Sequence, residues 1–163
     1  MDRSSIVDGV TNATIAAAPS RVVSIDLVAA SYRASAFPQD WRREDRERES
    51  LRYEKFLRLA ARDPLTRATP TREIDEMWHL HLLRPVASYK DCLRLFGQIF
   101  DHDGGFGTRP GELPILKAAF RAFADLWARE YGEPFVDHMP SDDAGAANCW
   151  HDCSNRCWHA CSR

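Results

Sequence analysis

The residues best suited to chemistry gather at the C-terminal end of the chain, in a short repeat. It reads Cys-Trp-His-x-Cys-Ser-x-Arg and then Cys-Trp-His-x-Cys-Ser-Arg, with a period of eight residues. Its candidate metal ligands are Cys149, Cys153, Cys157, Cys161, His151 and His159. Because the cysteines are four apart, a helical tail would place all four thiols on one stripe, advancing about 40° per step.

Thiolates and imidazoles are the ligands that Zn(II) and Cu(I) prefer. Arg156 and Arg163 in the same tail would favour the thiolate form. The spacing differs from a zinc finger, in which a longer loop separates two cysteine pairs. The tail therefore predicts a soft-metal site. Redox or disulfide chemistry, a substrate segment for a modifying enzyme, and a tail without a specific role stay open as alternatives.

A second group of candidate ligands lies in the middle of the chain. Asp75 and His79 are four residues apart, so on a helix they are neighbours on one face. His102, in a loop rich in aspartate and glycine, is a candidate third member, and Cys92 is a fourth. Together these residues predict a second metal site, or the centre of a metal-dependent enzyme. The alternative is structural, with His79 tying its helix to the loop of His102.

Composition and charge exclude several classes of function. Lysine and arginine number 22 and aspartate and glutamate 24, giving a net charge of −2. That balance argues against nucleic-acid binding, which needs a basic excess. There is neither an apolar run of the ~20 residues that a membrane span requires nor a signal peptide's continuous apolar region. We therefore expect a cytoplasmic protein that binds neither nucleic acid nor membrane.

The periodicity of apolar residues predicts helices, and no segment alternates as a strand would. The expected helices cover 22–37, 41–63, 70–84, 86–100 and 114–131. This predicts an all-α fold, a single compact domain of about five helices with a Cys/His-rich C-terminal tail. The expected divisions are a flexible arm at 1–20, the helical domain at 21–140, and linker and tail at 141–163.

Local signals refine these helices. Asp40 is the expected N-cap of the second helix and Thr69 that of the third, with Pro70 at its first position. The charged run 42–49 is expected to form a solvated helix face. Pro85 predicts a kink or short break. The buried side of the fourth helix is expected to carry Tyr89, Cys92, Leu93, Phe96, Ile99 and Phe100.

An ordered set of residues between about 50 and 135 resembles the glycine-rich domain-containing protein family. The residues that carry this resemblance are Tyr53, Phe56, Leu57, Pro70, Thr71, Ile74, Asp75, Trp78, His79, His81, Tyr89, Asp91, Cys92, Phe96, Gly97 and His102. The resemblance implies a helical domain. It points to the bacterial branch of the family, whose members often carry a Gly- and Cys-rich tail. This tail differs in being rich in tryptophan, histidine and cysteine, with almost no glycine.

The favoured interpretation is a non-enzymatic protein that binds Zn(II) or Cu(I) through its tail, with the helical domain as scaffold. One alternative is a protein or peptide recognition module, or a precursor whose Cys-rich tail a partner enzyme modifies. Another is a metal-dependent enzyme that uses Asp75, His79 and His102.

Overall fold

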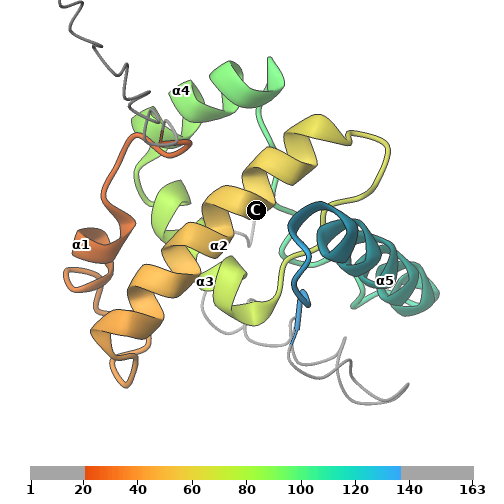
Figure 1. The fold of residues 1–163 in the computed structure, drawn as a ribbon, viewed down its shortest axis with the longest axis horizontal. Helices are drawn as coiled ribbons and strands as arrows, with labels where there is room; N and C mark the ends of the chain where they lie inside the picture. Colours follow the sequence, from red (N-terminus) through yellow and green to blue (C-terminus); the bar gives the residue numbers. More distant parts are fainter. Residues whose placement is uncertain (1–20, 137–163) are drawn as a thin grey trace, which may run out of the picture.

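The computed structural model describes residues 21–136, and all regular structure in that part of the chain is helical (Figure 1). The helices are α1 (Leu27–Ser31), α2 (Arg43–Arg62), α3 (Arg72–Leu82), α4 (Pro85–Phe96) and α5 (Glu112–Tyr131). The prediction of an all-α fold is thus confirmed over 21–136. The tail lies outside the described residues.

The long helix α2 is the centre of the arrangement. It contacts α1, α3 and α4, and α3 also contacts α1 and α4. The helix α5 lies beside the C-terminal half of α2 (Figure 1). Phe56 of α2 joins the two halves of the core, because its ring lies 5.5 Å from that of Trp78 on α3 and 5.2 Å from that of Phe123 on α5. One continuous apolar core therefore positions α3, the helix that carries most of the candidate chemistry.

The first helix is much shorter than the predicted 22–37, and hydrogen bonds from backbone amides to side-chain carboxylates explain why it begins late. The amide N–H of Val22 donates to a carboxylate oxygen of Glu54, and that of Ser24 donates to Asp91 at 2.7 Å. These amides bind carboxylates on α2 and α4, so a helix begins only where Asp26 accepts from the amide of Ala29.

Two predicted N-caps were wrong. At α2 the cap position is Arg42, whose N–H donates to Asp45 at 3.1 Å, so Asp40 has no capping role. At α3 the cap is Thr71, whose hydroxyl accepts from the amide of Ile74 at 3.3 Å. Thr69 lies two residues before this cap and bonds the carbonyl of Arg67 instead.

The charged run 42–49 is not the uniformly solvated face expected from its composition, because Arg46 and Glu49 are buried. The guanidinium of Arg46 donates to the carbonyls of Trp41 and Pro38 and to the Ser31 hydroxyl at 2.7 Å. It also lies over the rings of Tyr32 and Phe37, at 4.3 and 4.9 Å. The loop between α1 and α2 is therefore folded around one arginine.

The break predicted at Pro85 is confirmed, since α3 ends at Leu82 and Pro85 is the first residue of α4. The predicted buried side of the fourth helix is confirmed for Cys92, and Phe96 and Phe100 are partly buried against the core. The prediction was wrong for Tyr89, Leu93 and Ile99, which are exposed, and α4 also buries Ser88 and Asp91. Polar partners for Asp91, described below, outweigh the apolar pattern in setting which side of α4 faces inward.

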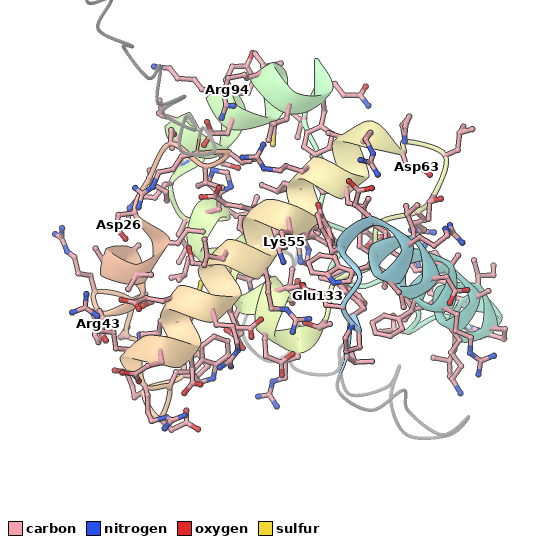
Figure 2. All side chains as sticks on the ribbon, in the orientation of Figure 1. Asp26, Arg43, Lys55, Asp63, Arg94 and Glu133 are labelled. Carbon is pink, nitrogen blue, oxygen red and sulfur yellow. The ribbon has the colours of Figure 1, made fainter. Side chains whose placement is uncertain are left out.

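The helix α5 ends at Gly132, as predicted, with φ of 66° in the left-handed region that favours glycine. After this turn, Glu133 pairs with Lys55 of α2 at 2.9 Å (Figure 2). Arg62 of α2 pairs with Glu130 in the last turn of α5. No helix within 21–136 has the length and apolarity to cross a bilayer.

Candidate metal centre

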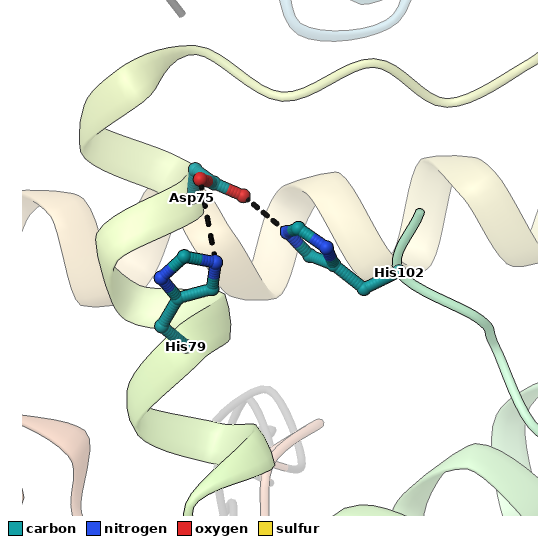
Figure 3. Close-up of side chains that lie close together, drawn as sticks. All are labelled: Asp75, His79 and His102. Carbon is teal, nitrogen blue, oxygen red and sulfur yellow. Dashed lines mark hydrogen bonds and ion pairs between the residues drawn. The ribbon is translucent and has the colours of Figure 1, made fainter. Parts of the chain in front are cut away.

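Asp75, His79 and His102 lie together and are called here the Asp75 cluster (Figure 3). Their ligand atoms all lie within 4.8 Å of one another. The His102 Nε2 atom is 2.6 Å from Asp75 Oδ1, and the His79 Nε2 atom is 3.5 Å from Asp75 Oδ2. One carboxylate therefore faces two imidazoles. His102 is hydrogen-bonded to one of its oxygens, and His79 lies close to the other.

Two elements position this cluster. Asp75 and His79 come from successive turns of α3, as their spacing of four predicts. His102 comes from the loop after α4, which Gly97 turns with φ of 70°. Beyond that turn, the ring of Phe100 stacks on Trp78 and the ring of His102 is T-shaped to it, with centroid distances of 4.9 and 4.6 Å. Trp78 thus holds the loop so that His102 reaches Asp75.

Burial and charge set the pKa of His102 in this cluster. The side chains of Asp75, His79 and His102 are 13%, 19% and 12% exposed, so water reaches them only in part. Burial alone lowers the pKa of His102, but the hydrogen bond and negative charge of Asp75 outweigh it and hold that pKa above its usual value. Without a metal ion, Asp75 therefore attracts a proton to His102.

The cluster faces a cavity of about 300 Å³, called here the aromatic pocket. This pocket lies between the end of α2, the linker 64–70, α3 and the loop 98–106. Trp78, Phe100 and Phe106 form part of its wall, and Asp75 and His102 contribute polar atoms to it. His79 does not line it. Two of the three cluster residues are therefore reachable from the pocket.

The other predicted ligands fall elsewhere. Cys92 is buried on α4 and is not part of the group formed by Asp75, His79 and His102. The six tail candidates, Cys149, Cys153, Cys157, Cys161, His151 and His159, lie outside the described residues.

A second cluster, called here the Asp91 cluster, was missed by sequence reasoning. The Tyr53 hydroxyl lies 2.9 Å from His81 Nδ1, and His81 Nε2 lies 3.2 Å from Asp91 Oδ2. The three residues come from α2, α3 and α4 and are 0%, 2% and 2% exposed. Their pairings span 28 and 10 residues of sequence, so no local spacing could have revealed them.

Asp91 is saturated with hydrogen bonds. It accepts from the Ser24 amide at 2.7 Å and from Arg94 at 2.9 Å, as well as from His81. Burial raises the pKa of Asp91, but these donors outweigh it and hold the pKa below its usual value. Burial also lowers the pKa of His81 and raises that of Tyr53 well above its usual range. The tyrosine therefore donates to neutral His81, which donates to ionised Asp91.

The two clusters differ in what they can do chemically. In the Asp91 cluster the side-chain polar atoms of Tyr53, His81 and Asp91 all have protein partners and are shielded from water. This cluster therefore acts as an internal brace that links α2, α3 and α4. In the Asp75 cluster, two imidazoles and one carboxylate converge beside a cavity. Two histidines and a carboxylate form a ligand set of catalytic zinc sites and of non-haem iron sites, both of which keep coordination positions open.

Comparisons with known proteins give a family match. The model of the family described as glycine-rich domain-containing protein-like matches residues 4–91. The match starts and ends earlier than the stretch 50–135 identified from the sequence. It contains Asp75 and His79 and all of the Asp91 cluster, whereas His102 and α5 lie beyond it.

A curated relative is glycine-rich domain-containing protein 1 of Arabidopsis thaliana. It is 32% identical over 63 residues, which are 39% of this chain and 8% of the relative. The chain thus spans a small fraction of that relative's length. It has only eight glycines, so the shared part is not a glycine-rich segment. No solved structure matches the chain.

Proposed function

The chain belongs to the glycine-rich domain-containing protein-like family, and within it we propose that the helical domain binds a divalent transition metal through Asp75, His79 and His102. The observation that carries this proposal is the convergence of the three ligand atoms within 4.8 Å. Atoms bound to one zinc ion at about 2.0–2.1 Å lie at most about 4 Å apart. Small side-chain rotations would therefore bring all three donors onto one ion.

Zn(II) is the first candidate for this site. Imidazole suits zinc, copper, iron and nickel, whereas Cu(I) prefers thiolates, which the Asp75 cluster lacks. Structural zinc sites have four protein ligands, but sites with three keep one position for water or another ligand. We therefore propose a site with an open coordination position rather than a purely structural one.

The tail is a second candidate metal site, supported by its repeated Cys-Trp-His pattern. Its four cysteines and two histidines would bind Zn(II) or Cu(I) independently of the helical domain. A tail modified by a partner enzyme is the alternative, and the intact mass of protein from its native host distinguishes it. Placement in the bacterial branch of the family also stays a proposal, supported by the cysteine-rich tail.

The decisive experiment measures metal content and zinc affinity of the full chain, purified without a metal-affinity tag. One variant has serine at all four tail cysteines, and in that background His79→Ala and His102→Ala remove single ligands. We expect one zinc per chain without the tail thiols. We also expect at least about a 100-fold loss of affinity with either histidine change, since even indirect contacts to a metal contribute 10–100-fold.

The matched control is Asp125→Ala, which removes an exposed carboxylate of α5 and should leave zinc affinity unchanged. If the serine variant binds no zinc, or if His79→Ala lowers only the stability of the fold, the Asp75 cluster is a hydrogen-bonded latch between α3 and the loop. Metal that depends entirely on the cysteines would assign the site to the tail.

A further inference from the structure

The aromatic pocket beside the Asp75 cluster is larger than a single metal ion requires. Its volume of about 300 Å³ is at the lower end of small-molecule sites and leaves no room for a folded segment or an oligonucleotide. Asp75 and His102 are part of its wall, whereas His79 is not. A metal held by all three residues would therefore be approached from the pocket along the side of Asp75 and His102.

The pocket wall is mainly aromatic. Trp78, Phe100 and Phe96 form a continuous stack, with ring centroids 4.9 and 4.3 Å apart and planes 9° and 11° from parallel. All three line the pocket. Aromatic walls of this kind favour flat, apolar groups, through area burial and ring–ring contacts.

The linker 64–70 and the loop 98–106 also contribute to the pocket wall. The Arg67 guanidinium lies 3.5 Å from the ring centroid of Phe106, and both residues line the cavity. Asp101 and Asp103 are exposed at the rim, where water and salt screen their charges. Inside, a divalent ion with Asp75 as its carboxylate ligand would carry a net positive charge. The polar end of the pocket would then attract an anionic donor.

Resting on the proposed metal site, we propose that this pocket binds a small aromatic molecule with one anionic, metal-ligating oxygen group, such as a carboxylate or hydroxamate. The ring lies against the Trp78–Phe100–Phe96 stack and under Phe106. The oxygen group takes the open position of the ion at Asp75 and His102. The volume of the pocket limits the molecule's size, the aromatic lining favours a flat ring, and Asp75 and His102 fix where its oxygen group meets the ion.

The test uses benzohydroxamate as the probe, titrated by calorimetry into the zinc-loaded full chain with serine at the four tail cysteines. Acetohydroxamate has the same metal-binding group without the ring, and benzyl alcohol has the ring without that group. We expect benzohydroxamate to bind at least about tenfold more tightly than either. Cobalt substitution adds a second measurement, because a probe oxygen on the ion changes the visible spectrum.

Three variants and one control separate the contribution of the pocket wall from that of the metal ion. Phe106→Ala and Arg67→Ala should weaken benzohydroxamate about tenfold and leave zinc and acetohydroxamate affinity unchanged. Arg67 is exposed, so its variant tests the wall even if Phe106→Ala unfolds. His79→Ala, a residue outside the pocket, should abolish both zinc and benzohydroxamate binding. Tyr89→Ala removes an exposed aromatic ring elsewhere and should change nothing.

Each contrary result is distinct. Equal affinity for the two hydroxamates, or wild-type binding by both wall variants, overturns the ligand proposal while the metal site stands. Benzohydroxamate binding that survives His79→Ala shows that the ion is not needed and overturns it as well. Failure of the parent protein to bind zinc removes the proposed function and this inference together.

Discussion

Helix α3 contributes a histidine to each of two clusters, and in both of them the histidine faces an aspartate. These histidines, His79 and His81, are two residues apart. His81 lies in the core between Tyr53 and Asp91. His79 lies near the surface with Asp75 and His102, beside a cavity. The difference shows that a histidine–carboxylate pair is a brace or a candidate site according to what else surrounds the carboxylate.

The contrast lies in how each carboxylate is satisfied. Asp91 receives donors from a backbone amide, an arginine and a histidine, so its bonds are with the fold itself. Asp75 faces two imidazoles, which can exchange a proton for a metal ion. The first arrangement contributes to stability and the second can respond to a ligand, and the following experiments test that division.

The largest expected effect comes from removing the buried carboxylate. Asp91→Ala leaves the Ser24 amide and His81 without their acceptor, and breaking a buried polar pair typically costs about 3 kcal/mol of unfolding free energy. Asp75→Ala should cost less, about 1–2 kcal/mol, because its partners are two histidine side chains that water still reaches in part. Urea denaturation of both variants measures the difference. Equal losses would contradict the division into brace and site.

The contribution of ionised Asp91 to stability should appear in the pH dependence of unfolding. Its pKa is lower in the folded protein than in the unfolded chain, so its contribution is present above about pH 4 and is lost as pH falls through the folded value. We expect the unfolding free energy to fall as the pH drops below about 4, and to fall less in Asp91→Asn. The exposed Asp125→Asn is the matched control and should keep the wild-type slope. Parallel slopes for all three proteins would count against an ionised, hydrogen-bonded Asp91.

The smallest expected effect comes from the turn that brings His102 to Asp75. Gly97 has φ of 70°, and an added Cβ would meet nothing within 4 Å, so the only penalty of Gly97→Ala is backbone strain. That penalty is about 1 kcal/mol. Gly105→Ala in the same loop has no positive φ and should cost less. Thermal unfolding of the pair measures this difference, and equal midpoints would show that the turn is not strained.

Local signals in the sequence predicted much of the helical framework. The break at Pro85 and the end of the last helix at Gly132 follow from the chemistry of proline and glycine. The spacing of four residues between Asp75 and His79 correctly placed them on one face, because residues i and i+4 are neighbours on an α-helix. That these residues and His102 bind a metal stays a prediction.

What the sequence did not show depends on partners distant along the chain. The Asp91 cluster joins three helices, so the local sequence around Tyr53, His81 and Asp91 gives no sign that these residues contact one another. Tyr89, Leu93 and Ile99 of the fourth helix were predicted to be buried but are exposed, because the side of α4 that carries Asp91 faces inward. Arg46 was hidden within a run of charges, although its partners are mainly carbonyls rather than acids.

The guanidinium of Arg46 also has a consequence for the motions of the domain. Its bonds to Ser31, Pro38 and Trp41 all depend on one side chain, so the contacts that hold the loop between α1 and α2 are coupled through it. When that side chain leaves its place, all three acceptors lose their donor together. The loop therefore opens as one cooperative unit, and its protected amides should exchange with solvent at a common rate rather than in a graded series.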